Sequence, residues 1–176
     1  MITAEAIHKS KRVAGNVIRY HTWPTITNQT VADHTYHVMR IYHELFGHSI
    51  HFDWDYEIFD TILRHDMGEQ MVGDLPYPIK KNDPVLAARV SFWEFIAQRE
   101  QGWDSGVDLD PDTGTAIKIC DLLEMAEYAR YESNLGNEYA QVVFSRVVDH
   151  VYSMNEFWGR YPLIKEAMTK LVKEMT

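Results

Sequence analysis

Residues 63–80 read LRHDMGEQMVGDLPYPIK, and an ionisable His65–Asp66 pair stands in this stretch at the end of an apolar helical pattern. The pattern follows a 4-3-4 spacing, which predicts one core-facing helical stripe: Ile58, Ile62, His65 and Glu69. Asp66 lies beside that stripe. Burial of an unpaired charge costs many kcal/mol, so such a group has to be paired, protonated or bound to a metal.

Two other helical stripes carry an ionisable residue at a position where a core side chain is expected. One of them contains His34 within the series Val31, His34, Val38, Ile41 and Leu45. The other contains Asp121 within the series Ile117, Asp121, Met125 and Tyr128. Three stripes with histidine or aspartate on their inner faces favour a shared site over three unrelated core residues.

Apolar periodicity at helical spacing runs through most of the chain, and alternating strand patterns are scarce. The fold class is therefore predicted to be all-α, a helical globule of about six helices in one domain over residues 1–176. The expected helices are 29–46, 56–66, 85–101, 112–131, 138–158 and 162–174. Residues 73–84, which hold three prolines, are expected to form a loop.

Composition limits the possible partners. Lys and Arg number 17 against 26 Asp and Glu, which gives a formal net charge of −9. Proteins that bind duplex nucleic acid are usually basic, so no nucleic-acid partner is expected. No apolar run reaches the length of a membrane span and no signal peptide is recognisable, so we expect a cytoplasmic protein without a membrane partner. The single cysteine, Cys120, excludes an internal disulfide.

The four residues His34, His65, Asp66 and Asp121 could satisfy one another around one divalent cation. Imidazole and carboxylate ligands suit transition metals, and Co²⁺, Zn²⁺ and Mn²⁺ all remain open. The alternative is that each histidine is a hydrogen-bonded core residue, and that the adjacent His-Asp pair arose by chance.

This arrangement resembles the HD-domain phosphohydrolases, which carry one His, then a His-Asp doublet, then a distant Asp. The surrounding sequence is similar to that of the YfbR-like 5′-deoxynucleotidases in three segments: VADHTYHV (31–38), LRHDMGEQMVGDLPYPIK (63–80) and KICDLLEMAEYA (118–129). The short length and the segment RYHTWP (19–24) most resemble the small phage dATP triphosphohydrolases of the DatZ type. For a phage-encoded enzyme the location would be the host cytoplasm.

The resemblance implies a metal-dependent enzyme that converts dATP to deoxyadenosine plus triphosphate and so depletes the dATP pool. Its metal would lower the pKa of water and polarise a phosphoryl oxygen. Additional Mg²⁺ could bind the phosphates of the substrate. One alternative is a 5′-deoxynucleotidase restricted to deoxynucleoside monophosphates. Another is a non-catalytic nucleotide-binding module that has kept the HD fold.

The resemblance also implies roles for other residues. Glu69 and Asp74 would orient water or carry protons, although Glu69 could be a solvated helix carboxylate and Asp74 a capping residue at the start of the loop. Three cations would bind the phosphates: Arg19, Lys80 and Lys81. Four residues would form the sugar and base pocket: Trp23, Tyr20, Pro78 and Ile79.

By the same analogy the partner is a small-molecule deoxynucleotide, and the protein is expected to be a homo-oligomer, with a compact hexamer as the model. Aromatic residues of the later helices are expected to build the core and a subunit interface. They are Phe92, Trp93, Phe95, Tyr128, Tyr131, Phe144 and Trp158.

Overall fold

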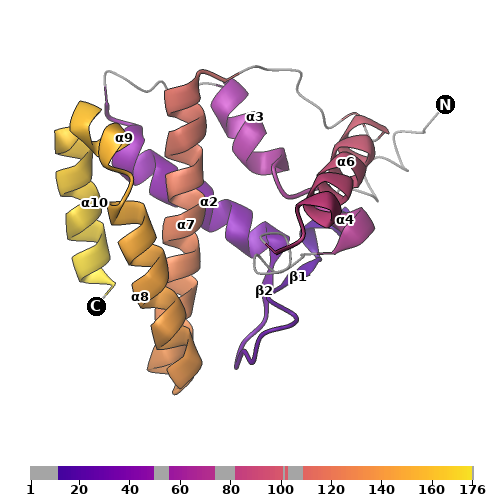
Figure 1. Ribbon diagram of the computed structural model, residues 1–176, viewed down its shortest axis with the longest axis horizontal. Helices are drawn as coiled ribbons and strands as arrows, with labels where there is room; N and C mark the ends of the chain where they lie inside the picture. Colours follow the sequence, from indigo (N-terminus) through magenta and orange to yellow (C-terminus); the bar gives the residue numbers. More distant parts are fainter. Residues whose placement is uncertain (1–11, 50–55, 74–81, 101, 103–108, 176) are drawn as a thin grey trace. The chain divides into compact units, whose positions relative to one another are not determined.

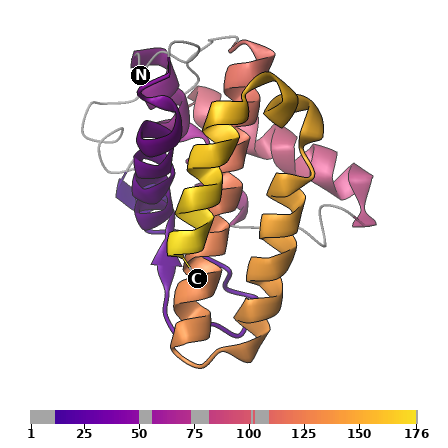
Figure 2. The ribbon, with the colours of Figure 1, turned by 90° about the vertical axis from the view of Figure 1, so that its left-hand side faces the viewer.

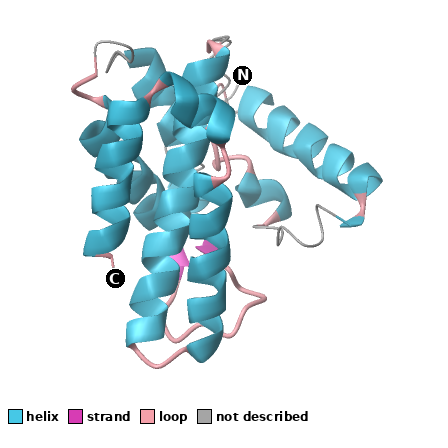
Figure 3. Ribbon diagram, turned by 60° about the vertical axis from the view of Figure 1, so that its left-hand side comes forward, coloured by secondary structure: helices cyan, strands magenta, loops and turns pink. Residues whose placement is uncertain are grey.

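The structure is a computed structural model that describes residues 12–49, 56–73, 82–100, 102 and 109–175. Helices account for most of these residues, as the cyan ribbon in Figure 3 shows, and the all-α prediction is confirmed. About six helices were expected, and the described residues hold eight. No helix among the described residues combines the length and the apolar character that crossing a membrane requires.

The elements follow one another along the chain as labelled in Figure 1. Two short strands come first, β1 (Ile18–Arg19) and β2 (Gln29–Thr30), and they pair antiparallel. The helices are α2 (Val31–Phe46), α3 (Tyr56–Arg64), α4 (Glu69–Val72), α6 (Pro84–Glu100), α7 (Pro111–Asn134), α8 (Glu138–Tyr152), α9 (Asn155–Arg160) and α10 (Pro162–Glu174).

The chain divides into two compact units. The first unit comprises residues 1–36 and 60–107, and the second comprises residues 37–59 and 108–176. Helices α2 and α3 each contribute residues to both units. The first unit holds β1, β2, α4 and α6, whereas the second holds α7 to α10.

In the second unit, α7 and α8 lie side by side along their length (Figures 1 and 2). A buried cluster joins the two helices, in which three alanines pack with one phenylalanine ring: Ala126, Ala129, Ala140 and Phe144. The tight connection between the helices includes Gly136, whose φ of 104° is a conformation that side chains disfavour. The expectation that Phe144 and Trp158 are core residues is confirmed, whereas Phe92, Trp93, Phe95 and Tyr131 are exposed.

The first predicted helix begins two residues too early, because Gln29 and Thr30 form strand β2. A capping box then starts α2. The Asp33 N–H donates to Thr30 Oγ1 (3.2 Å), and the Asp33 carboxylate accepts from the Thr30 N–H (3.1 Å). This reciprocal pair satisfies backbone donors that a helix start leaves open, which fixes the first turn of α2 at Val31.

The prediction of one helix over 138–158 is wrong, because the chain breaks between α8 and α9. The Ser153 hydroxyl donates to the carbonyl of His150 (2.7 Å), and the Asn155 N–H turns back to the Ser153 carbonyl (2.8 Å). Serine competes in this way for backbone acceptors that a helix needs. The buried Trp158 indole then donates to the Val151 carbonyl (2.7 Å) and closes the turn.

Helix α7 has an unusually complete N-cap. One carboxylate oxygen of Asp110 accepts from the N–H groups of Asp112 and Thr113, both at 3.0 Å, and the Thr113 hydroxyl donates to the other oxygen. Pro111 follows at the first helical position, where its missing N–H costs nothing. The hydroxyl and backbone N–H of Thr113 lower the pKa of Asp110 below its ordinary value.

We expect Asp110→Ala to lower the free energy of unfolding by about 1 kcal/mol, because it removes the cap, whereas Asp110→Asn keeps most of it. Urea unfolding followed by far-UV circular dichroism measures the difference. Since the folded-state pKa is depressed, the charge-dependent part of the cap, which is the wild-type advantage over Asp110→Asn, is fully present above pH 3.8, the ordinary value, and is lost as pH falls through the folded-state pKa. Equal stability of wild type and Asp110→Ala at pH 7 would contradict the assignment.

Candidate metal centre

His34 lies in the second turn of α2 and is fully buried. The other members of its predicted stripe, Val31, Val38, Ile41 and Leu45, are buried as well, so the stripe is confirmed as the inner face of the helix. His34 is thus a polar residue at a core position, and its ring needs a partner there.

His65 and Asp66 follow the end of α3 in a turn, whereas the sequence predicted a helix that continues to residue 66. His65 Nδ1 lies 2.6 Å from the Ile62 carbonyl. This contact competes for the acceptor that the Asp66 N–H would use if the helix continued. Because a carbonyl only accepts, Nδ1 carries the hydrogen, and Nε2 of the neutral ring keeps its lone pair for another partner.

Three possible ligand atoms meet in the first unit. His34 Nε2 lies 3.1 Å from His65 Nε2, and Asp66 Oδ2 lies 3.3 Å from the first nitrogen and 3.5 Å from the second. Donors bound to one metal at about 2.1 Å are about 3.0–3.4 Å apart for octahedral to tetrahedral angles. The three atoms therefore have the separations of ligands on one face of a metal ion, and the fixed ring of His65 already presents the correct nitrogen.

Arg19 adds a positive charge to this group. It lies in β1, opposite Gln29 of β2, and its nearly buried guanidinium donates to Asp66 Oδ2. The ladder continues where the Val31 N–H donates to the Val17 carbonyl (2.9 Å). Since β2 leads directly into α2, this short pairing fixes Arg19 relative to the helix of His34.

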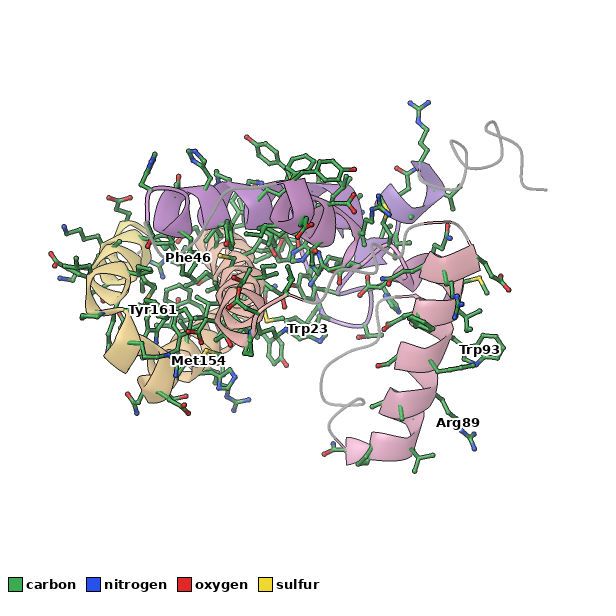
Figure 4. The ribbon with its side chains drawn as sticks, turned by 90° about the horizontal axis from the view of Figure 1, so that it is seen from above. Trp23, Phe46, Arg89, Trp93, Met154 and Tyr161 are labelled. Atoms are coloured by element: carbon green, nitrogen blue, oxygen red, sulfur yellow. The ribbon has the colours of Figure 1, made fainter. Side chains whose placement is uncertain are left out.

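Two of the predicted pocket residues follow Arg19 in the chain. Tyr20 is buried, and its φ of 56° is rare for a residue other than glycine. Its ring lies under the Arg19 guanidinium (5.3 Å) and stacks on the ring of Trp23 (centroids 4.9 Å apart). Trp23, labelled in Figure 4, is half-buried, so a three-layer stack begins at the cation and ends on an aromatic ring that solvent reaches.

Glu69 is buried, as the predicted stripe requires. The prediction placed it on one continuous helix with His65, however, and that helix is not formed. Residues 65–68 form turns, in which the Met67 N–H donates to the Arg64 carbonyl and the Glu69 N–H to the Asp66 carbonyl, both at 3.0 Å. Glu69 begins the separate helix α4. Its position near the doublet therefore depends on the turn and not on one continuous helix.

Six further site residues were predicted from the sequence. Asp121 lies on α7 in the second unit, where Lys118 one turn earlier donates to its carboxylate, and metal ligation by Asp121 stays a prediction. Five residues lie outside the described residues: Asp74, Pro78, Ile79, Lys80 and Lys81.

Sequence reasoning missed two residues through which the turn and α6 meet. Gln98 of α6 donates to backbone carbonyls of the turn, and Gly68 lies against the backbone of α6. A glycine three residues after His65 was a usable signal of close packing. Gln98 gave no such signal, because a glutamine in a helix is common.

We expect His65→Asn to weaken Co²⁺ binding by more than about 100-fold, because it removes one of the three ligands. Isothermal titration calorimetry with Co²⁺ measures this change. His37→Asn is the matched control, because His37 lies one turn after His34 on α2 but faces Glu127, 3.8 Å away. If both variants bind Co²⁺ as the wild type does, the three-atom site is not the metal site.

A family model described as 5′-deoxynucleotidase YfbR-like matches residues 13–101, which include Arg19, His34, His65, Asp66 and Glu69. No curated protein matches the chain. HD-type hydrolases depend on a metal, and the His34–His65–Asp66 group fits one. The chain therefore belongs to the YfbR-like 5′-deoxynucleotidase family of the HD superfamily, which is a family of phosphohydrolases.

Proposed function

We propose that the protein is a metal-dependent phosphohydrolase that removes the whole 5′-phosphate chain from dATP, giving deoxyadenosine and triphosphate. The observation that carries the hydrolase part is the meeting of three ligand atoms with a guanidinium at Asp66. The preference for dATP is supported by the segment RYHTWP and by the resemblance to the small phage enzymes. The reaction adds one water across the bond between the α-phosphorus and the 5′-oxygen.

In this proposal His34, His65 and Asp66 hold one divalent metal, and Asp121 adds a fourth ligand. When bound, the metal supplies a Lewis acid and lowers the pKa of water, which makes an effective nucleophile at neutral pH. Glu69 and Asp74 then orient the water and hold the proton that it releases. Glu69 is buried and begins α4 directly after the turn that carries His65 and Asp66, which supports a role at the metal centre.

Arg19 binds the phosphates in this proposal. Its planar guanidinium offers several donors, so one can stay on Asp66 while others contact phosphate oxygens. Lys80 and Lys81 add charge along a longer phosphate chain. A net charge of −9 repels a nucleotide at long range, so binding requires such a local group of cations.

The stacked rings of Tyr20 and Trp23 support a pocket for the sugar and the base. An aromatic ring attracts a base by stacking, and close apolar packing against the sugar leaves an added 2′-hydroxyl without a partner. That penalty would reject ribonucleotides. Pro78 and Ile79 complete the pocket in this proposal.

A deoxynucleotidase for monophosphates is the second candidate, because the matching family model is described by that activity. The two candidates share the metal, Arg19 and the pocket. They differ in whether the site accepts and retains the β- and γ-phosphates.

We expect the pure protein with added Co²⁺ to release deoxyadenosine and intact triphosphate from dATP, with little turnover of dGTP, ATP or dAMP. Asp66→Asn removes a charged ligand and should lower the rate at least about 1,000-fold. Asp149→Asn, a change at an exposed aspartate of α8, is the control and should keep full activity. Chromatography of nucleosides and phosphates measures the products.

Other products would lead to other conclusions. Turnover of dAMP, or of all deoxynucleoside monophosphates, with none of dATP would establish the nucleotidase. Nucleotide binding without turnover in the Co²⁺-loaded protein would identify a non-catalytic module and refute both enzymatic candidates.

We also expect Arg19→Lys to raise KM for the preferred nucleotide by about tenfold or more, with a smaller effect on kcat, because lysine keeps the charge but loses the fork of donors. Steady-state kinetics at saturating Co²⁺ separates the two constants. Arg160→Lys, which changes an exposed arginine that pairs with Asp112 in the second unit, is the control. Equal KM values for Arg19→Lys and wild type would exclude phosphate binding by this residue.

A further inference from the structure

We propose that Gln98 on α6 is a positioning residue for the metal centre, which it serves by holding the backbone of the turn that carries His65 and Asp66. This inference rests on the proposed metal-dependent function. Its basis is a pair of hydrogen bonds in the first unit: Gln98 Nε2 donates to the carbonyls of Arg64 and His65, each at 3.3 Å.

The carbonyls that Gln98 reaches lie at the end of α3 and at the first residue of the turn that follows it. Helix α3 ends at Arg64, so the carbonyls of its last residues have no N–H groups of a following helical turn. The Gln98 carboxamide caps this end of α3: it adds a donor to the Arg64 carbonyl, which also accepts from the Met67 N–H (3.0 Å), and it supplies a donor to the His65 carbonyl. Such a cap restrains the backbone at the residue that presents the metal ligand.

The same turn meets α6 at a second point, through Gly68. A Cβ atom added at Gly68 would lie 2.8 Å from both the Cβ and the carbonyl oxygen of Glu94, and 2.9 Å from its Cα. No side chain fits in that space unless a backbone moves. Helix α6 therefore contacts the turn directly at Glu94. Gln98 lies one helical turn after Glu94, so this contact also fixes the distance between Gln98 and the turn.

Arg64 supplies a third connection. Its Nε donates to Asp60 (2.6 Å) on the preceding turn of α3, and its Nη1 lies 3.3 Å from the carbonyl of Gly102, just after α6. The turn is thus held to α6 on both sides of the His-Asp doublet. Of these connections, the bond from Gln98 to the His65 carbonyl is the one that ends on the backbone of His65 itself.

Movement of this backbone would reach the metal ligands directly. The His65 ring is tied to the Ile62 carbonyl through Nδ1, so its direction depends on the local backbone geometry. Metal sites need their ligands within roughly 0.5 Å of the productive geometry. Loss of the Gln98 bonds should therefore loosen the ring of His65 and weaken metal binding without removing any ligand.

The test uses the full chain and two variants. Gln98→Glu keeps the size of the side chain and removes both N–H donors, and Gln98→Met does so without adding charge. Arg99→Met, at the exposed neighbouring position on α6, is the control. The readouts are the Co²⁺ dissociation constant, the visible spectrum of bound Co²⁺, the thermal melting curve and, in metal-free protein, the ¹⁵N shifts of His65, which report its tautomer.

We expect both Gln98 variants to weaken Co²⁺ binding by about 10- to 100-fold, the usual effect of outer-shell partners, and to change the Co²⁺ spectrum. In metal-free protein, His65 should go from the Nδ1–H tautomer to a mixture. Arg99→Met should change none of these. A lower melting temperature with an unchanged dissociation constant and an unchanged tautomer would assign Gln98 a structural role only and overturn the proposal.

The proposed function and this inference can fail separately. A wild type that binds Co²⁺ but hydrolyses no deoxynucleotide would refute the function, and the shift in Co²⁺ affinity would still decide the role of Gln98. If the wild type bound no Co²⁺, the proposed metal centre would be refuted, and the proposed role of Gln98 in that centre would be refuted as well. The tautomer of His65 would then report only whether Gln98 orders the turn.

Discussion

The carboxylate of Asp66 is the constraint on which the first unit depends. One of its oxygens faces two imidazole nitrogens and a guanidinium, so the groups around it come from three separate stretches of chain. Largely buried charges are stable only with such partners, and removing one of them leaves the others unpaired at a cost of several kcal/mol. The strand pairing of Arg19, the burial of His34 and the turn after α3 all serve to bring these partners to one point.

Much of this arrangement follows from the sequence, because it depends on periodic patterns. The stripe around His34 predicted a buried face of α2, and that face is buried. The end of α3 and the break at Ser153 were missed for one physical reason. In both places a side chain competes for a backbone carbonyl, through the His65 ring and the Ser153 hydroxyl, and such contacts leave no trace in apolar spacing.

The candidate site was predictable where chemistry and pattern coincide. Histidine and aspartate on inner stripes indicated a shared centre, and His34, His65 and Asp66 meet there. Gln98 could not be found in this way, because its contribution depends on which carbonyls α6 approaches, and that is a property of tertiary packing. In Figure 4, Arg89 and Trp93 project from the same side of α6, and Trp93 is exposed in this chain.

The short pairing of β1 with β2 has a consequence for how such enzymes can diversify. Arg19 and Gln29 pair in the ladder, and Thr30 is held by the capping box. Residues 20–28, between Arg19 and Gln29, therefore form a closed loop with fixed ends. A loop of this kind can change in sequence or length without moving its anchors. In the proposed function, where Tyr20 and Trp23 contact the sugar and the base, mutations in this loop would exchange one nucleobase preference for another while the hydrolytic groups stay in place, so new specificities would arise without passing through inactive intermediates.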